Sequence, residues 1–175
     1  MEKKNKLSST FGYFALVLGS IWFGAYFSRL LITYQMFEAT DLSLKNYIST
    51  ENLPSIFQTL YPMISLTFIT YLLLILSFTF FLFSTKLKFR ENGWLLVISL
   101  IIYLTLPFEV ILLSIDYKMM LLFLNDQFPS NIILELIVKR ITLLSSFPII
   151  IILSYISIPF FLVFKPFTLK SINEN

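Results

Sequence analysis

Four long runs without a charged residue constrain this chain more than any other feature of its sequence. They cover residues 7–28, 52–85, 92–108 and 141–164, and the first and third continue in apolar character beyond a single charge, Arg29 and Glu109. A hydrocarbon layer of about 30 Å needs about 20 apolar helical residues to cross it. The runs do not alternate with the period of two that a membrane barrel requires. The sequence therefore predicts an all-α integral membrane protein that crosses the bilayer as a four-helix bundle.

Composition narrows the chemistry that such a bundle can perform. Only 13% of the 175 residues are charged, about half the share that a soluble domain uses to solvate its surface. There is no cysteine and no histidine, so thiolate chemistry, the commonest metal ligand and the usual general base are all missing. We therefore predict a protein that is not an enzyme, with no catalytic residue, no cofactor and no metal ion. We interpret the net charge of +3 as the result of basic residues that set the membrane topology, and not as a sign of nucleic-acid binding.

The longest run is too long for one perpendicular span. At about 1.5 Å per residue, a helix over residues 52–85 would reach roughly 50 Å. Pro54 and Pro62 mark where the excess is expected, so residues 52–60 are predicted to be loop or interfacial structure. The chain is then one membrane domain over residues 1–175, with helices at about 11–36, 61–84, 93–115 and 141–164. Two longer connections, about 37–60 and 116–140, lie on the same side, and the apolar residues of the second predict a segment on the membrane surface.

The distribution of lysine and arginine predicts which side is cytoplasmic, because cytoplasmic segments carry the excess of these residues. With the N-terminus inside, eight of them face the cytoplasm and four face outward, with Arg29 assigned to the membrane. The eight are Lys3, Lys4, Lys6, Lys86, Lys88, Arg90, Lys165 and Lys170, and the four are Lys45, Lys118, Lys139 and Arg140. Both termini are therefore expected to be cytoplasmic.

Arg29 and Glu109 are the two charges expected at membrane depth, where ionisable residues are costly and mark function by default. The first and third helices run in the same direction, so both residues fall in the outer half of the bilayer. The sequence predicts an ion pair between them. Such a pair would lock two helices together, handle a substrate or proton, or recognise a partner helix. Arg29 could instead extend its side chain to the outer headgroups.

Small polar residues follow one face of the second helix. Thr67, Thr70 and Ser77 are separated by three and seven residues, a spacing that places them on the same side. In a membrane such residues hydrogen-bond across helix interfaces. They either serve ordinary packing within the bundle or form a face for another membrane helix.

One segment of the first outer loop carries a resemblance. Ser49-Thr50-Glu51-Asn52-Leu53-Pro54-Ser55-Ile56 resembles the first periplasmic loop of the immunity proteins against pore-forming colicins of the A type, so Glu51, Asn52 and Pro54 are candidate recognition residues. The likeness continues loosely over about 120 residues, whereas the almost wholly apolar stretch 63–70 departs from the family. The looser matches are Tyr61-Pro62, the turn Lys86-Leu87-Lys88, Phe108-Glu109, and Lys165, Pro166 and Lys170 near the C-terminus.

The resemblance implies a bacterial inner-membrane protein that binds the pore-forming domain of a colicin through the toxin's hydrophobic hairpin and prevents channel opening. Its partners would be that toxin and the lipid bilayer, and no nucleic acid. Two other functions share the same composition. The chain could be a small accessory or scaffold subunit of a membrane complex, or a small transporter.

Overall fold

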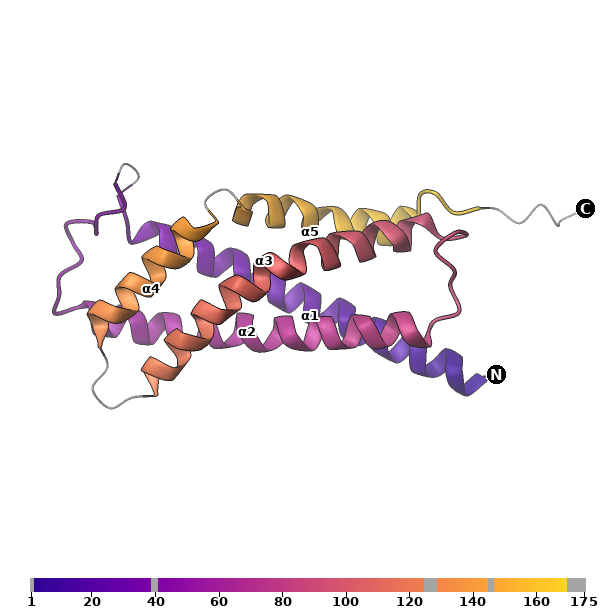
Figure 1. The fold of residues 1–175 in the computed structure, drawn as a ribbon, viewed down its shortest axis with the longest axis horizontal. Coiled ribbons are helices and arrows are strands. Elements are labelled where there is room, and N and C mark those ends of the chain that lie inside the picture. The colour runs from indigo at the N-terminus through magenta and orange to yellow at the C-terminus, as the bar shows by residue number, and fades with distance from the viewer. Residues whose placement is uncertain (1, 39–40, 125–128, 145–146, 170–175) are drawn as a thin grey trace, which may run out of the picture.

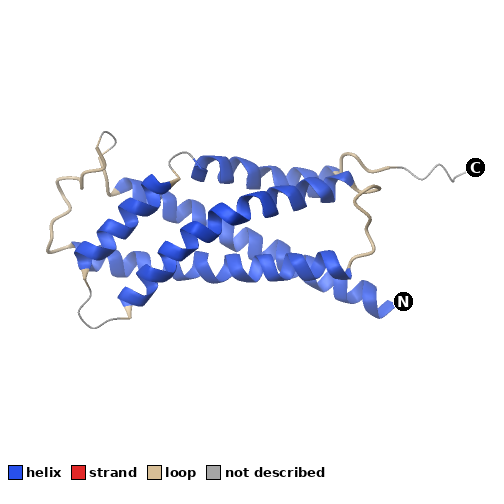
Figure 2. Cartoon of the chain, in the orientation of Figure 1, coloured by secondary structure: helices blue, strands red, loops and turns tan. Residues whose placement is uncertain are grey.

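The computed structural model describes residues 2–38, 41–124, 129–144 and 147–169. Within these ranges the chain is all-helical and contains no strand, as Figure 2 shows. The helices are α1 (Glu2–Gln35), α2 (Leu53–Ser84), α3 (Gly93–Phe123), α4 (Ser130–Leu143) and α5 (Phe147–Phe164). The all-α class is confirmed. Four of the five helices, α1, α2, α3 and α5, are long and apolar enough to cross a membrane, so the chain is a multi-pass membrane protein by length and composition.

The long helices lie roughly along one axis and give the molecule two distinct ends (Figure 1). The start of α1 and the end of α5 lie at one end, which we call the terminal end. The short helix α4 and the connection between α1 and α2 lie at the other, the loop end. The closest pairing is between α1 and α2, whereas α1 meets α5 at few positions. The α1–α5 side is therefore a loosely packed seam of the bundle.

The predicted start of the second helix was wrong. Residues 53–60, expected to be loop or interfacial structure before a helix at about 61–84, are the first turns of α2. Pro54 stands at the first helical positions, where its missing N–H would have had no helical partner. Leu53, Phe57 and Leu60 are all buried, and their spacing of four and three residues forms the apolar stripe that packs a helix onto a core.

The boundaries around the second outer connection also differ from the prediction. α3 continues to Phe123 instead of ending near residue 115, and residues 130–143 form the separate helix α4. The fourth spanning helix, α5, begins at Phe147 and not at 141; residues 145–146 lie outside the described residues. Ile133 and Ile137 of α4 are buried in the core at the loop end, whereas Leu121 and Ile132 are exposed. Part of the apolar surface that predicted a membrane-surface segment therefore packs onto the bundle itself.

Two apolar cores fill the bundle, one toward each end. The core toward the terminal end is built around Trp22, whose ring centroid lies 5.1 Å from that of Tyr71 and 4.7 Å from that of Tyr155. The core at the loop end joins α2, α3 and α4 to the connection after α1. Arg29, Thr67, Glu109 and Asp116, all buried, belong to neither core.

Glycine explains why α1 approaches α2 so closely. A Cβ atom added at Gly12 would lie 3.1 Å from the ring of Phe81, whereas one added at Gly24 would meet nothing within 4 Å. We predict that Gly12→Leu overpacks this interface and lowers the free energy of unfolding in detergent by about 1–3 kcal/mol. Gly24→Leu is the matched control and should leave stability unchanged or raise it, because glycine is a poor helix former. Equal effects of the two substitutions would contradict this account of the interface.

Candidate functional site

Asp116 is the centre of a buried charged cluster near the loop end. Its side chain is 1% exposed. Its Oδ2 accepts a hydrogen bond from Arg29 Nη1 at 2.8 Å, and its Oδ1 accepts from Arg29 Nη2 at 2.6 Å and from Arg140 Nε at 2.8 Å. One carboxylate therefore connects α1, α3 and α4. We call Arg29, Asp116 and Arg140 the arginine–aspartate cluster.

Arg29 approaches the aspartate from α1 in the geometry that guanidinium groups favour. Its two terminal nitrogens each meet a different carboxylate oxygen, the bidentate arrangement that gives the strongest charge-assisted pairs. Nη1 also donates to Thr67 Oγ1 at 3.2 Å, which adds α2 to the network. The Arg29 side chain is 6% exposed, so it is buried within the bundle, and the expectation that it could extend to the headgroups is wrong.

Arg140 approaches from the last turn of α4. Its side chain is 11% exposed, and its guanidinium carbon lies 5.8 Å from the centroid of the Tyr26 ring. At that distance the face of the ring attracts the cation. A small cavity of about 20 Å³ beside the two arginines is also lined by Pro148. The cluster is therefore level with the start of α5.

Glu109 does not form the ion pair with Arg29 that the sequence predicted. Arg29 pairs with Asp116 instead, and among the described residues Glu109 Oε1 has no hydrogen-bond partner. Glu109 is nevertheless 1% exposed and stands seven residues before Asp116, on the same face of α3. Together the two arginines and two carboxylates are formally neutral if all four are ionised. The prediction placed the right arginine in the cluster but gave it the wrong partner.

Each charge of the cluster can stay ionised in the protein interior only while its partners are present. A charge at such depth costs several kcal/mol to desolvate, and only a partner with good geometry offsets that cost. If the aspartate loses its charge, two guanidinium groups remain in an apolar interior. The cluster can therefore hold α1, α3 and α4 in one arrangement. It offers no exposed group to a substrate.

The small polar residues predicted on the second helix separate into different roles. Thr67 is in the network described above. Thr70 is buried and its hydroxyl donates within α2 to the carbonyl of Leu66 at 2.6 Å. Ser77 is only half-buried. The structure thus brings one of the three into the charged cluster and leaves the other two along α2.

The three loop residues singled out by sequence lie at the loop end, where α2 begins. Glu51 is exposed. Asn52 precedes the helix, and its side chain accepts from the Ser49 backbone N–H at 2.8 Å and donates to the Tyr47 carbonyl at 3.0 Å. Pro54 occupies the first turn. They form a defined turn on the molecular surface, separate from the arginine–aspartate cluster.

Sequence reasoning missed Asp116 and Arg140, which it assigned to the second outer connection. One signal could have found Asp116. It follows Glu109 by seven residues in an otherwise apolar stretch, and that spacing places two acids on one helix face. Arg140 gave a weaker signal, because it stands beside Lys139 at the edge of an apolar run and resembles an ordinary topological charge.

Among the described residues, no group of three or more acidic side chains is arranged to hold a metal ion. Comparison of the chain with protein-family models, with curated proteins and with solved structures finds no match.

Asp116 binds two arginines and Glu109 binds neither, so their substitutions are expected to differ in cost. Asp116→Asn removes the charge that holds both arginines, so it should lower the free energy of unfolding by about 3–5 kcal/mol. Glu109→Gln is the matched change on the same helix face and should cost no more than about 1.5 kcal/mol, the scale of one hydrogen bond. Reversible unfolding in mixed detergent micelles measures both. A larger loss for Glu109→Gln than for Asp116→Asn would contradict the assignment of Asp116 as the centre.

Proposed function

We propose that this chain is an immunity protein of the bacterial inner membrane, which binds the pore-forming domain of an A-type colicin and prevents its channel from opening. The observation that carries the proposal is the segment Ser49–Ile56, which resembles the first periplasmic loop of those proteins. The four helices that are long and apolar enough to cross a membrane agree with the four-helix plan that the resemblance implies.

The segment has the form of a recognition element. Asn52 holds the backbone at Tyr47 and Ser49 through its side-chain amide, so the turn is fixed before any partner arrives. A fixed turn loses little conformational entropy on binding. Glu51 and Ser55 are exposed on it, and the helix that follows is secured by the buried Leu53 and Phe57. A toxin approaching from the loop end would meet a preformed surface.

The lengths of the helices support a lobe beyond the bilayer at this end. α5 has 18 residues, about 27 Å, which is close to the thickness of the hydrocarbon layer. α2 has 32 residues, about 48 Å, and so exceeds that layer by about 18 Å. Since the charged cluster is level with the start of α5, it would lie at the outer edge of the hydrocarbon region. The first turns of α2 and the helix α4 would lie outside.

We propose that both termini are cytoplasmic, which places this lobe in the periplasm. Because Arg140 is engaged by Asp116 inside the bundle, it does not count as a free topological charge. The proposed cytoplasmic side then has eight lysines and arginines and the outer side has three, Lys45, Lys118 and Lys139, which strengthens the excess on the cytoplasmic side.

The arrangement also supports function by contact with another membrane protein. The arginine–aspartate cluster satisfies its charges internally, so we assign it to the structure of the bundle. What remains for a partner is the loop-end surface and the apolar faces in the membrane, where helix contacts are made by packing and small polar groups. Binding of a toxin before its channel opens requires only such contacts.

The immunity assay tests the proposed function. Sensitive cells that express this chain should survive at least one A-type pore-forming colicin that kills cells with an empty vector. We expect Glu51→Lys to lower that protection at least tenfold, because reversing a charge on a recognition turn introduces repulsion against the cognate partner. The readout is the toxin concentration that halves survival, at equal amounts of protein in the membrane.

Glu38→Lys is the matched control, since Glu38 is also an exposed acid of the first outer connection but lies outside the Ser49–Ile56 segment. It should protect as well as the wild type. Equal killing of expressing and control cells by every A-type toxin in a panel would overturn the proposal. A stoichiometric housekeeping partner that co-purifies without toxin would favour the accessory-subunit alternative instead.

The absence of cysteine from the sequence allows topology to be measured with single introduced cysteines. Thr50→Cys, at the loop end, should react in intact spheroplasts with a maleimide that cannot cross membranes. Arg90→Cys, in the turn between α2 and α3, should react only after the membrane is permeabilised. The reverse pattern would place the termini outside.

A further inference from the structure

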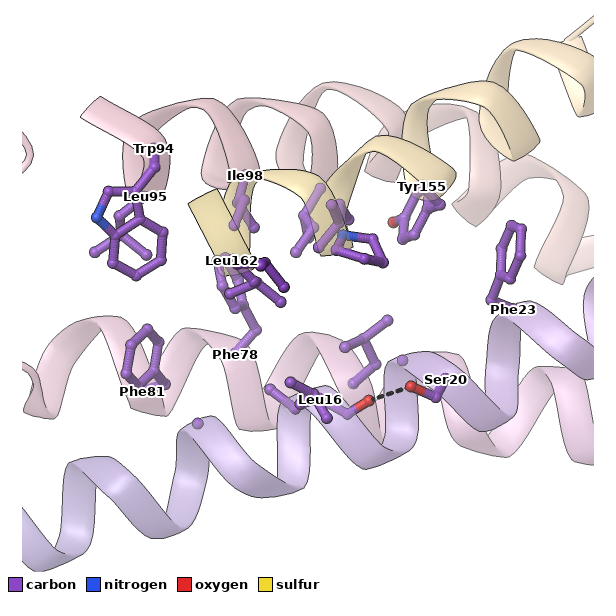
Figure 3. A pocket seen from close by; sticks show the side chains of 18 residues that line it. Leu16, Ser20, Phe23, Phe78, Phe81, Trp94, Leu95, Ile98, Tyr155 and Leu162 are labelled. Carbon is purple, nitrogen blue, oxygen red and sulfur yellow. Dashed lines mark hydrogen bonds between the residues drawn. The ribbon is translucent and has the colours of Figure 1, made fainter. Parts of the chain in front are cut away.

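A long apolar groove runs along the loosely packed seam between α1 and α5, toward the terminal end. It encloses about 530 Å³ and is lined by residues of α1, α2, α3 and α5. Its lining includes Leu16 and Ser20 of α1 and Val163 of α5, which are exposed, so the groove opens between those two helices. Figure 3 shows Phe81 and Trp94 at one end of the groove and Phe23 and Tyr155 at the other. Only Ser20, Trp94 and Tyr155 contribute a polar side-chain atom to the lining.

The dimensions of the groove indicate what kind of molecule fits it. Along α1 it extends from Gly12 to Phe23, which is about 16 Å at 1.5 Å per residue. This is half of a hydrocarbon layer of about 30 Å, the depth of one leaflet. A helix that spans the hydrocarbon layer is about 30 Å long, roughly twice the length of the groove. The length of the groove therefore matches one hydrocarbon chain of one leaflet and not a spanning helix.

One exposed cation lies at the terminal end of the groove, beside a buried tryptophan. Trp94 is only 7% exposed, and its indole Nε1 is enclosed by protein atoms and has no hydrogen-bond partner among the described residues. In Figure 3 this nitrogen lies on the side of the ring that faces away from the middle of the groove. The exposed Lys165 places its ammonium nitrogen 5.7 Å from the centroid of the same ring.

The backbone that follows α5 keeps Lys165 in this place. The amide of Gly93 donates to the Phe167 carbonyl at 3.1 Å, and that of Leu169 donates to the Glu91 carbonyl at 3.0 Å. A Cβ atom at Gly93 would lie 2.7 Å from Phe167 Cβ, so this close approach requires glycine. Lys165 itself has a φ of 44°, a left-handed conformation that is uncommon outside glycine. The segment is therefore tied across the start of α3.

We propose that the groove between α1 and α5 binds one acyl chain of an anionic phospholipid from the leaflet at the terminal end, with the lipid phosphate at Lys165, beside the ring of Trp94. The apolar lining takes the chain, the length matches one leaflet, and the lysine complements the phosphate charge. The bound chain would fill the seam at which α1 and α5 hardly touch. This inference depends on the membrane topology and not on toxin binding, so either can fail without the other.

Trp94 is a natural reporter, because Trp22 is the only other tryptophan of the chain. The full chain carrying Trp22→Phe is reconstituted in phosphatidylcholine vesicles, and quenching of Trp94 is titrated with phosphatidylglycerol or phosphatidylcholine that bears brominated acyl chains. We expect phosphatidylglycerol to occupy the site about fivefold more tightly, the preference that one lysine near an anionic surface confers. Lys165→Gln should abolish the preference. Lys86→Gln, an exposed lysine at the same end, should retain it.

A second pair of variants tests whether the acyl chain lies in the groove. Ser20→Phe fills it from α1 and should weaken quenching by both lipids. Thr10→Phe is the matched control, because Thr10 is also exposed and its hydroxyl makes the same bond to the fourth preceding carbonyl, but it does not line the groove. A second measurement uses chains that keep both tryptophans. The lipid that stays bound through purification is identified by mass spectrometry and compared between Lys165→Gln and Lys86→Gln. Equal quenching by the two lipids in the parent, equal effects of the two lysine changes, or full quenching in Ser20→Phe would each overturn the proposal.

Discussion

The fold depends on one carboxylate that two arginines share in the interior of a membrane protein. Asp116 on α3 accepts from Arg29 on α1 and from Arg140 on α4, so its position defines how three helices meet near the loop end. Hydrophobic burial gives little direction to helices that are already surrounded by lipid, and polar contacts therefore have a larger part in specifying their arrangement. The charged groups also require one another, since any of them left alone would be buried without a partner.

Sequence alone predicted the four spanning helices, because a run of about 20 uncharged apolar residues matches the thickness of the hydrocarbon layer and is rare in soluble chains. It did not predict where the helices end. Pro54 was assigned to a loop or interfacial segment before the second helix, yet it lies in the first turn of α2. Asp116 and Lys118 were assigned to the second outer connection, yet they lie within α3. In both cases tertiary contacts determine where the helix ends. Phe57 is fully buried in the loop-end core, and Asp116 is neutralised by arginines distant in sequence. Glu109 and Asp116 share one face of α3 and differ by about 10 Å along its axis, so the pairing of Arg29 with Asp116 depends on how far α1 and α3 are offset along their axes, which no local pattern encodes.

The structure divides the bundle into regions with different physical tasks. The arginine–aspartate cluster holds the helices together at the outer edge of the proposed hydrocarbon region. Beyond it, the turn at Ser49–Ile56 and the helix α4 form a surface of defined shape, on which Glu51, Glu135 and Lys139 are exposed. On its other side, α1 and α5 diverge and leave a groove of leaflet depth, with Lys165 and Trp94 at its mouth. Binding of a toxin and binding of a lipid would thus use opposite ends of one scaffold, which the cluster stabilises but does not itself expose.

The central claim is that the cluster organises the bundle through mutual neutralisation, and one comparison of unfolding free energies tests it most directly. Asp116→Leu leaves two buried arginines without a counter-charge and should destabilise the chain strongly in mixed micelles. The triple variant Arg29→Met/Asp116→Leu/Arg140→Met removes all the charges together and should regain most of the loss, because apolar residues of similar volume can replace a buried ionic cluster at little cost. A triple variant as unstable as Asp116→Leu alone would contradict the account.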